Sequence, residues 1–144
     1  MERREFIRKS CSLCLLVGSG IIAETLESCS TVPFYSAAIR DRRVTVPRSL
    51  LTNTPVLIVE PEEYEFNIAV EQRANGDYHA LLLRCTHAAN PLAFDGTQFT
   101  CSLHGSKFNE QGGVVRGPAS HPLQELTVHA TETELSIGLP EALQ

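Results

Sequence analysis

The sequence predicts an all-β domain of stacked antiparallel sheets with a separate lobe inserted near its middle. Short runs of β-branched and aromatic residues recur along the chain and are separated by Pro, Asn or Gly, which favour turns. The residues from 30 onward have the usual length of one domain, so we expect no second one. Neither an internal repeat nor a low-complexity tract interrupts this pattern.

The elements follow in order along the chain. Strands are predicted before the lobe at residues 43–46, 56–60, 65–71 and 78–84. Asn75-Gly76, within 74–77, predicts a hairpin turn, because Asn and Gly tolerate the positive φ angles of tight turns. In the lobe, about residues 85–120, we expect strands at 98–100 and 107–108, a turn at Asp95-Gly96 and another at 111–113. Strands at 123–130 and 134–138 close the sheet.

Two Cys-to-His pairs lie close together in the predicted lobe. Cys85 and His87 form the first pair, Cys101 and His104 form the second, and 13 residues separate the two. Two thiolates and two imidazoles can close one four-ligand metal site. A tetrahedral Cys2His2 set suits zinc, whereas the same set divided between two irons suits a [2Fe-2S] cluster.

The residues around these pairs resemble the Rieske iron-sulfur family over about residues 44–139. The segments similar to the family's two cluster boxes and proline loop are 85–87, 101–108 and Gly117-Pro118-Ala119 followed by Pro122-Leu123. The resemblance implies a Rieske-like fold with one [2Fe-2S] cluster per chain, held by Cys85, His87, Cys101 and His104. It also implies outward-facing imidazoles that give electrons a short path to a docked partner. A structural zinc site is the alternative, although zinc needs neither the Gly-Ser after the last His nor a Gly-Pro loop.

Residues beside the candidate ligands are expected to support the cluster. Gly105, and Gly117 before Pro118, permit backbone conformations that a residue with a Cβ would resist. Ser106 can donate its hydroxyl to a bridging sulfide, which would stabilise the reduced cluster and raise its potential. The alternative is that Ser106 only satisfies a loop amide.

Three positions depart from the high-potential members of that family. The resemblance aligns Asn90 and Leu103 with two extra cysteines that form a disulfide between the cluster loops in those members. Phe108 is aligned with a tyrosine whose hydroxyl donates to a ligand sulfur. Rieske centres span about −150 to +300 mV. Both losses predict a potential between those of the oxygenase-type ferredoxins and the quinol-oxidising proteins.

The N-terminus predicts export. Arg3-Arg4 and the residues after it resemble a twin-arginine signal, and the apolar run at 11–23 is shorter than the about 20 residues that a spanning helix needs. A removable signal is therefore favoured over an uncleaved anchor.

Residues 26–29 resemble a lipobox in which Cys29 would be lipidated, although Glu27 fits that motif poorly. Cleavage at another position and a chance Cys are the alternatives. The expected layout is a signal or anchor at 1–29, a tether at 30–42 and the cluster domain at 43–144.

The composition argues against several classes of partner. With 12 Lys and Arg against 17 Asp and Glu, a net charge of −5 and no basic stripe, nucleic acid is not expected to bind. The sequence also has no Gly-rich phosphate loop, no flavin or nicotinamide fingerprint and no nucleophile beside an evident base. His79, His121 and His129 are expected to be packing or surface residues. The acidic run at 60–65 is interpreted as a solvated loop, with guidance of a basic partner as the alternative.

These observations predict one-electron transfer without a catalytic site, because protein residues fill all four ligand positions. The first hypothesis is the iron-sulfur subunit of a membrane-associated respiratory oxidoreductase on the periplasmic side of a bacterial inner membrane. Its partners would be a redox donor and acceptor such as quinol and a cytochrome. The alternatives are a free-standing exported carrier similar to a ferredoxin, favoured by the missing disulfide and tyrosine, and a zinc-stabilised binding module.

Overall fold

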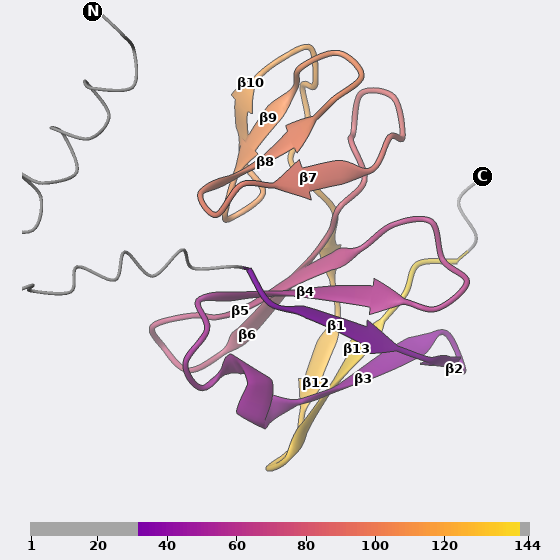
Figure 1. Ribbon diagram of the computed structural model, residues 1–144, viewed down its shortest axis with the longest axis vertical. Coiled ribbons are helices and arrows are strands. Elements are labelled where there is room, and N and C mark those ends of the chain that lie inside the picture. Colours follow the sequence, from indigo (N-terminus) through magenta and orange to yellow (C-terminus); the bar gives the residue numbers. More distant parts are fainter. Residues whose placement is uncertain (1–31, 142–144) are drawn as a thin grey trace, which may run out of the picture.

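The computed structural model describes residues 32–141, and within them the fold is all-β, as predicted (Figure 1). The strands are β1 (Phe34–Ala37), β2 (Ile39–Arg40), β3 (Arg43–Pro47), β4 (Val56–Pro61), β5 (Ile68–Gln72), β6 (Tyr78–Leu82), β7 (Leu92–Phe94), β8 (Gln98–Cys101), β9 (Lys107–Asn109), β10 (Val114–Arg116), β11 (Glu125–Leu126), β12 (Val128–Ala130) and β13 (Glu134–Gly138). One short 3-10 helix, η1 (Arg48–Leu51), follows β3.

The strands form three sheets. The central sheet has the order β1-β4-β5-β6-β11, the outer sheet β12-β13-β3-β2 and the lobe sheet β10-β9-β8-β7. Figure 1 shows the lobe sheet at one end of the molecule and the other two sheets packed together at the opposite end. The strand pairs in these sheets are antiparallel except for β1 with β4, which run parallel.

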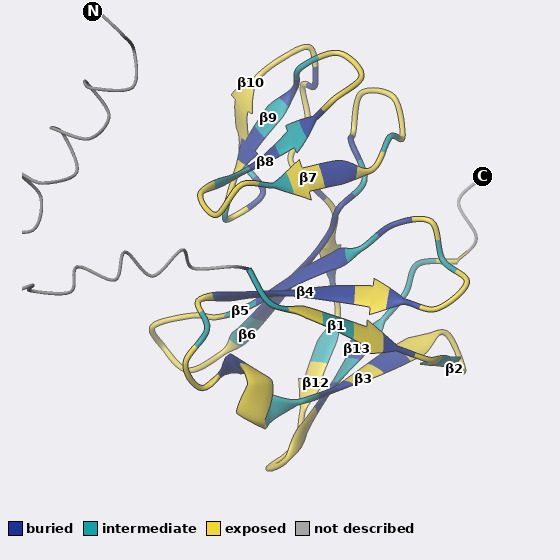
Figure 2. Cartoon of the chain, viewed as in Figure 1, coloured by how far each residue is buried: buried dark blue, intermediate teal, exposed yellow. Residues whose placement is uncertain are grey.

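The central sheet is buried on both faces. Leu57 and Val59 of β4 belong to a core shared with the outer sheet, which contributes Val44, Val46, Leu135 and Ile137. The alternate residues Val56 and Ile58 belong to a second core that contains Phe99 and Phe108 of the lobe. Because side chains alternate across a strand, an uninterrupted apolar run such as 56–59 is what a sheet covered on both faces requires. Figure 2 shows the resulting buried band through β4, β5 and β6.

The prediction of a tether at 30–42 is wrong from residue 34 onward. Residues 34–40 form β1 and β2, and β1 lies at the edge of the central sheet with Phe34 opposite Ile58. Ala37 is only 5% exposed and joins the core, so packing holds this segment against the domain. The predicted signal, anchor and lipobox at 1–29 lie outside the described residues. Within the described part of the chain, no helix is long and apolar enough to cross a membrane.

The predicted strand at 123–130 is divided between two sheets. β11 pairs with β6 in the central sheet, whereas β12 pairs with β13 in the outer sheet. The chain changes sheets at Thr127, whose carbonyl accepts a 2.9 Å hydrogen bond from the backbone N–H of Gly138. The predicted strand at 65–71 also begins later, at Ile68.

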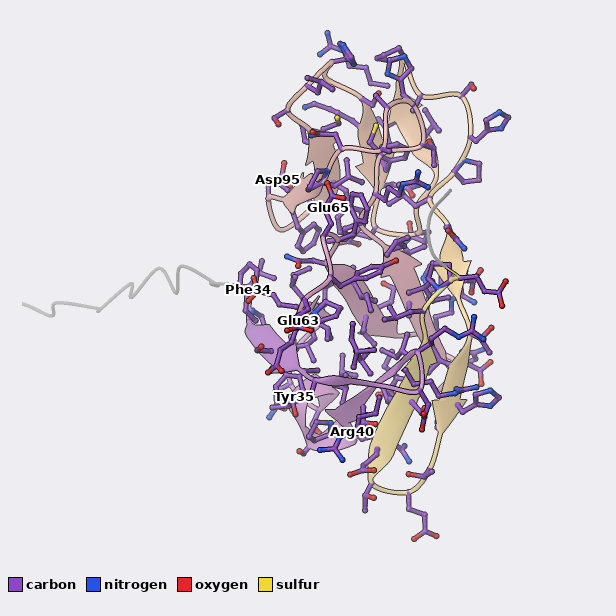
Figure 3. The ribbon with its side chains drawn as sticks, turned by 90° about the vertical axis from the view of Figure 1, so that its right-hand side faces the viewer. Phe34, Tyr35, Arg40, Glu63, Glu65 and Asp95 are labelled. Carbon is purple, nitrogen blue, oxygen red and sulfur yellow. The ribbon has the colours of Figure 1, made fainter. Side chains whose placement is uncertain are left out.

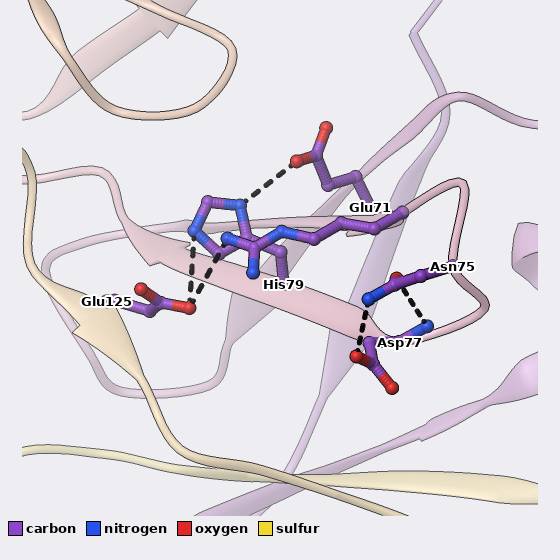
Figure 4. Close-up of polar contacts among 6 residues, drawn as sticks. Glu71, Asn75, Asp77, His79 and Glu125 are labelled. Carbon is purple, nitrogen blue, oxygen red and sulfur yellow. Dashed lines mark hydrogen bonds and ion pairs between the residues drawn. The ribbon is translucent and has the colours of Figure 1, made fainter.

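The hairpin between β5 and β6 is confirmed. The backbone N–H of Arg73 donates to the carbonyl of Asp77 at 2.8 Å, and Gly76 has a φ of 90°. Asn75 contacts Asp77 within the turn (Figure 4).

His79 is a packing residue of this sheet. It is 2% exposed, and its Nδ1 lies 3.0 Å from Glu71 Oε1 while its Nε2 lies 3.5 Å from Glu125 Oε1 (Figure 4). The imidazole therefore links β5, β6 and β11 through polar contacts.

The lobe touches the central sheet closely at Gly112, in the predicted turn at 111–113. Gly112 has a φ of 81°, and a Cβ on it would lie 3.0 Å from Leu81 Cδ2 of β6. Its carbonyl accepts a 2.9 Å hydrogen bond from the backbone N–H of Leu123. Glycine is therefore required here both by the backbone conformation and by the approach of the two parts.

Replacing Gly112 with Ala should destabilise the protein more than replacing Gly76. Both glycines have positive φ angles, so either substitution costs roughly 1–2 kcal/mol of backbone strain. A Cβ at Gly76 meets nothing within 4 Å, whereas one at Gly112 overpacks Leu81, which adds about 1–3 kcal/mol. Denaturant unfolding of G112A and G76A measures the difference. Equal losses in the free energy of unfolding would contradict the proposed contact between lobe and sheet.

Candidate metal centre

The four predicted ligands lie on two loops of the lobe. The first loop, residues 85–90, follows β6, and the second, residues 101–106, joins β8 to β9. The cysteines are buried, with Cys85 1% and Cys101 0% exposed, whereas His87 and His104 are exposed. Each loop therefore turns its thiol inward and its imidazole outward.

Both loops have the same backbone hydrogen bonds. In the first loop, Cys85 N–H donates to the carbonyl of Asn90 at 2.8 Å, and Ala89 N–H donates to the carbonyl of Cys85 at 2.9 Å. In the second loop, Cys101 N–H donates to the backbone carbonyl of Ser106 at 2.9 Å, and Gly105 N–H donates to the backbone carbonyl of Cys101 at 3.0 Å.

The same position of each loop has a positive φ angle. Gly105 has a φ of 77°, as its predicted role requires, and Ala89 adopts 47° although it carries a Cβ. The surrounding hydrogen bonds therefore impose the left-handed conformation on the first loop without a glycine.

The two thiols form a pair. Both cysteines are free, and their side chains lie close enough to interact. Burial alone raises the pKa of the Cys101 thiol, but hydrogen bonds from the backbone N–H groups of Leu103 and His104, and from the side chains of Cys85 and Asn90, bring this pKa below its ordinary value. The Cys101 thiol is thus easier to ionise than an ordinary cysteine, and the thiolate is the form of cysteine that binds metals.

The two imidazoles form a second pair. The ring centroids of His87 and His104 are 5.0 Å apart, with the rings at 82° to each other. No three His, Cys, Asp or Glu side chains within residues 32–141 are grouped as a single metal ion requires. The four predicted ligands instead form a thiol pair and an imidazole pair, the division that suits a cluster of two irons.

Ser106 contacts the proline loop. Its side chain is 0% exposed, and its Oγ accepts a 3.0 Å hydrogen bond from the backbone N–H of Ala119. The loop-amide role considered for Ser106 is therefore present. The hydroxyl hydrogen takes no part in that contact, because the oxygen acts there as the acceptor.

The remaining supporting residues are Phe108, Gly117 and Pro118. Phe108 is 0% exposed and packs in the same core as Phe99. The Gly117-Pro118 peptide bond is cis. Gly117 has no positive φ, and a Cβ there would come no closer than 3.7 Å to the carbonyl of Ala119, so the expectation that this position needs glycine is wrong.

Two contacts of the first loop had no signal in the sequence pattern. Thr86 Oγ1 donates to the carbonyl of His121 at 2.7 Å, which ties the first loop to the proline loop. Asn90 Nδ2 lies 3.8 Å from Cys101 Sγ and donates to it. In the sequence, Asn90 stands out only as a missing cysteine, because the partner of its side chain lies on another loop.

The other residues singled out in the sequence lie at the surface. His121 and His129 are exposed. Glu60, Glu62, Glu63 and Glu65 are exposed as well, and Figure 3 shows Glu63 and Glu65 on the same side of the molecule as Asp95. The acidic run is therefore solvated.

A family model, the Rieske [2Fe-2S] domain, matches residues 44–127. Curated relatives include cytochrome b6-f complex iron-sulfur subunit 2 of Nostoc sp., 42% identical over 56 residues that cover 39% of this chain and 30% of that protein. The chloroplastic subunit 1 of Nicotiana tabacum is 46% identical over 48 residues, which cover 32% of this chain and 20% of that protein. The matches thus span less than a third of these relatives.

Solved structures share the fold. Naphthalene 1,2-dioxygenase with indole bound has a TM-score of 0.52 at 18% identity, covering 68% of this chain and 26% of that one. The quaternary ammonium Rieske monooxygenase CntA in complex with L-carnitine has a TM-score of 0.52 at 16% identity, covering 69% of this chain and 32% of that one. At such identities the likeness concerns the fold alone. Since the family model matches more than half of the chain, and the paired thiols and imidazoles lie inside the match, the chain belongs to the Rieske [2Fe-2S] domain family.

Proposed function

We propose that this domain transfers single electrons through a Rieske [2Fe-2S] cluster, as the iron-sulfur subunit of a membrane-associated respiratory oxidoreductase. Cys85 and Cys101 would bind one iron, and His87 and His104 would bind the other. The observation that carries the proposal is the pairing of two buried thiols with two exposed imidazoles on matched loops. When bound, the cluster supplies a one-electron redox couple.

The residues of the lobe suit this role. Burial of both cysteines keeps water from the sulfurs, and backbone N–H groups of the second loop donate to Cys101. The exposed imidazoles leave a direct path to a docked partner. Leu103, 55% exposed and next to His104, offers that partner an apolar contact.

The relatives named as cytochrome b6-f iron-sulfur subunits support membership in a membrane complex, with quinol and a cytochrome as candidate partners. The twin-arginine-like segment at residues 3–9 supports placement on the periplasmic side of a bacterial membrane, either after cleavage or with Cys29 lipidated. Mass spectrometry of membrane-extracted protein tests the lipid, because an unmodified Cys29 excludes it.

A free-standing exported carrier is the second candidate. It is favoured by the absence of the loop disulfide, since Asn90 and Leu103 occupy the positions of the two bridging cysteines in high-potential relatives. Co-purification with a cytochrome or a molybdenum subunit from membranes supports the subunit role. Recovery of the whole pool as a soluble single chain supports the carrier.

Substitution of any one proposed ligand should abolish the cluster. Purified wild-type protein should contain iron and acid-labile sulfide, with a visible spectrum and a paramagnetic signal on reduction. C101S and H104A should lose these signals, because three protein ligands cannot complete both irons. H121A, an exposed histidine of the same region, is the matched control and should keep them. Zinc without sulfide in the wild type, or normal assembly in C101S, would overturn the proposal.

Replacing Ser106 with Ala should separate its two roles. The change leaves the buried N–H of Ala119 without its acceptor, which costs about 1–3 kcal/mol of stability. It also removes the hydroxyl donor, so the cluster should remain but its potential should fall. S102A, at an exposed serine of the same loop, should change neither quantity. A loss of stability at unchanged potential would assign Ser106 to the loop amide alone.

A further inference from the structure

We propose that Asn90 is a positioning residue for the cluster: its side-chain amide donates a hydrogen bond to the Cys101 sulfur, joins the two ligand loops and raises the reduction potential. The inference rests on the proposed function, since it concerns the same cluster. Its geometric basis is the 3.8 Å contact between Asn90 Nδ2 and Cys101 Sγ.

Hydrogen bonds of both the backbone and the side chain of Asn90 hold its side-chain amide in place. The backbone carbonyl of Asn90 accepts a 2.8 Å hydrogen bond from Cys85 N–H, which closes the first loop. Its Nδ2 also lies 3.1 Å from the carbonyl of Pro91. A primary amide carries two N–H groups, one for each of these acceptors. The flipped amide would set Oδ1 against a carbonyl oxygen and a thiolate, so chemistry selects the donor orientation.

The acceptor of this bond is poorly solvated. Cys101 is 0% exposed, so protein donors take the place of water around its sulfur. These donors are the N–H groups of Leu103 and His104, which are part of the loop backbone, and the side chains of Cys85 and Asn90. Once both cysteines bind iron, the amide of Asn90 is the side-chain donor that remains.

The bond should favour the reduced state of the cluster. Reduction adds negative charge, part of which falls on the ligand sulfurs, and a hydrogen bond strengthens as its acceptor becomes more negative. The amide therefore stabilises the reduced form more than the oxidised form. The potential rises by the difference between the two.

Asn90 also differs from its counterpart in the second loop. Ser106 holds the same backbone position, but its side chain turns to Ala119 rather than across to the first loop. Two side-chain contacts join the two ligand loops within residues 32–141. One is the contact between Cys85 and Cys101, and the other is the hydrogen bond of Asn90 with Cys101. Asn90 is aligned with one of the two cysteines that form the loop disulfide in high-potential relatives. In this chain a hydrogen bond therefore joins the two loops at that position.

The test compares Asn90→Leu and Asn90→Asp with Asn109→Ala. Leu keeps the size of the side chain without a donor, and Asp keeps its shape but presents a carboxylate to the sulfur. Asn109 is an asparagine of the same lobe whose Oδ1 accepts from Gly113 N–H at 2.7 Å and whose side chain has no hydrogen bond with either cysteine. Paramagnetic resonance with redox titration gives the potential, and loss of visible absorbance over time gives cluster retention.

We expect N90L to lower the equilibrium constant for reduction by roughly two- to tenfold, where tenfold is about 59 mV for one electron. N90D should lower it further, and N109A should leave it unchanged. Equal potentials in N90L and wild type, even with faster cluster loss, would overturn the tuning role and leave only a structural one. A wild-type protein without iron and sulfide would instead refute the proposed function, so the two failures differ.

A measurement on the unaltered protein covers the case in which neither variant assembles. Wild-type protein labelled with 15N at the asparagine side-chain amide should show a 15N hyperfine coupling to the reduced cluster, because the hydrogen bond carries spin density from sulfur to Nδ2. Among the side-chain hydrogen bonds of residues 32–141, that of Asn90 is the one that joins an asparagine to either cysteine. Absence of that coupling would overturn the inference.

Discussion

Burial of the central sheet on both faces is the interaction on which the position of the metal centre depends. The outer sheet covers one face, and the lobe covers the other. β7, β9 and β10 have three residues each, at the short end of the usual range for strands. Phe99 and Phe108 belong to the core shared with the central sheet, which adds to the apolar contacts within the lobe. Cys85, three residues beyond β6, is therefore fixed relative to a rigid core.

The second cysteine is placed by the lobe itself. Cys101 ends β8, where it lies opposite Leu92 of β7, and both residues belong to the core beneath the loops. One thiol is thus carried by the central sheet and the other by the lobe sheet. Any movement between the two sheets would separate the two thiols. The packing at Gly112 and the matched loop hydrogen bonds therefore both keep the thiols together.

The sequence predicts what depends on local pattern and misses what depends on distant partners. Uninterrupted apolar runs identify β4 and β6. The Cys-His spacing singles out four residues that the structure arranges as a thiol pair and an imidazole pair. β1 was missed because it is stabilised by parallel pairing with β4, more than 20 positions away in the chain. The division between β11 and β12 is set by which sheet each half joins, and nothing in 123–130 marks it. The contact of Asn90 is likewise defined only once the two loops are adjacent.

The lobe contains three loops around the site, and, apart from the contact between Cys85 and Cys101, each pair of loops is joined by one side-chain hydrogen bond. Asn90 with Cys101 joins the two ligand loops, Thr86 with His121 joins the first to the proline loop, and Ser106 with Ala119 joins the second to it. At a net contribution of about 1 kcal/mol each, these three hydrogen bonds together stabilise the fold about as much as a typical disulfide, which contributes roughly 2–4 kcal/mol. The two devices differ in where they act: a disulfide restricts the unfolded chain, whereas these bonds exist only in the folded lobe. A domain built this way holds its loops together without an oxidised bridge.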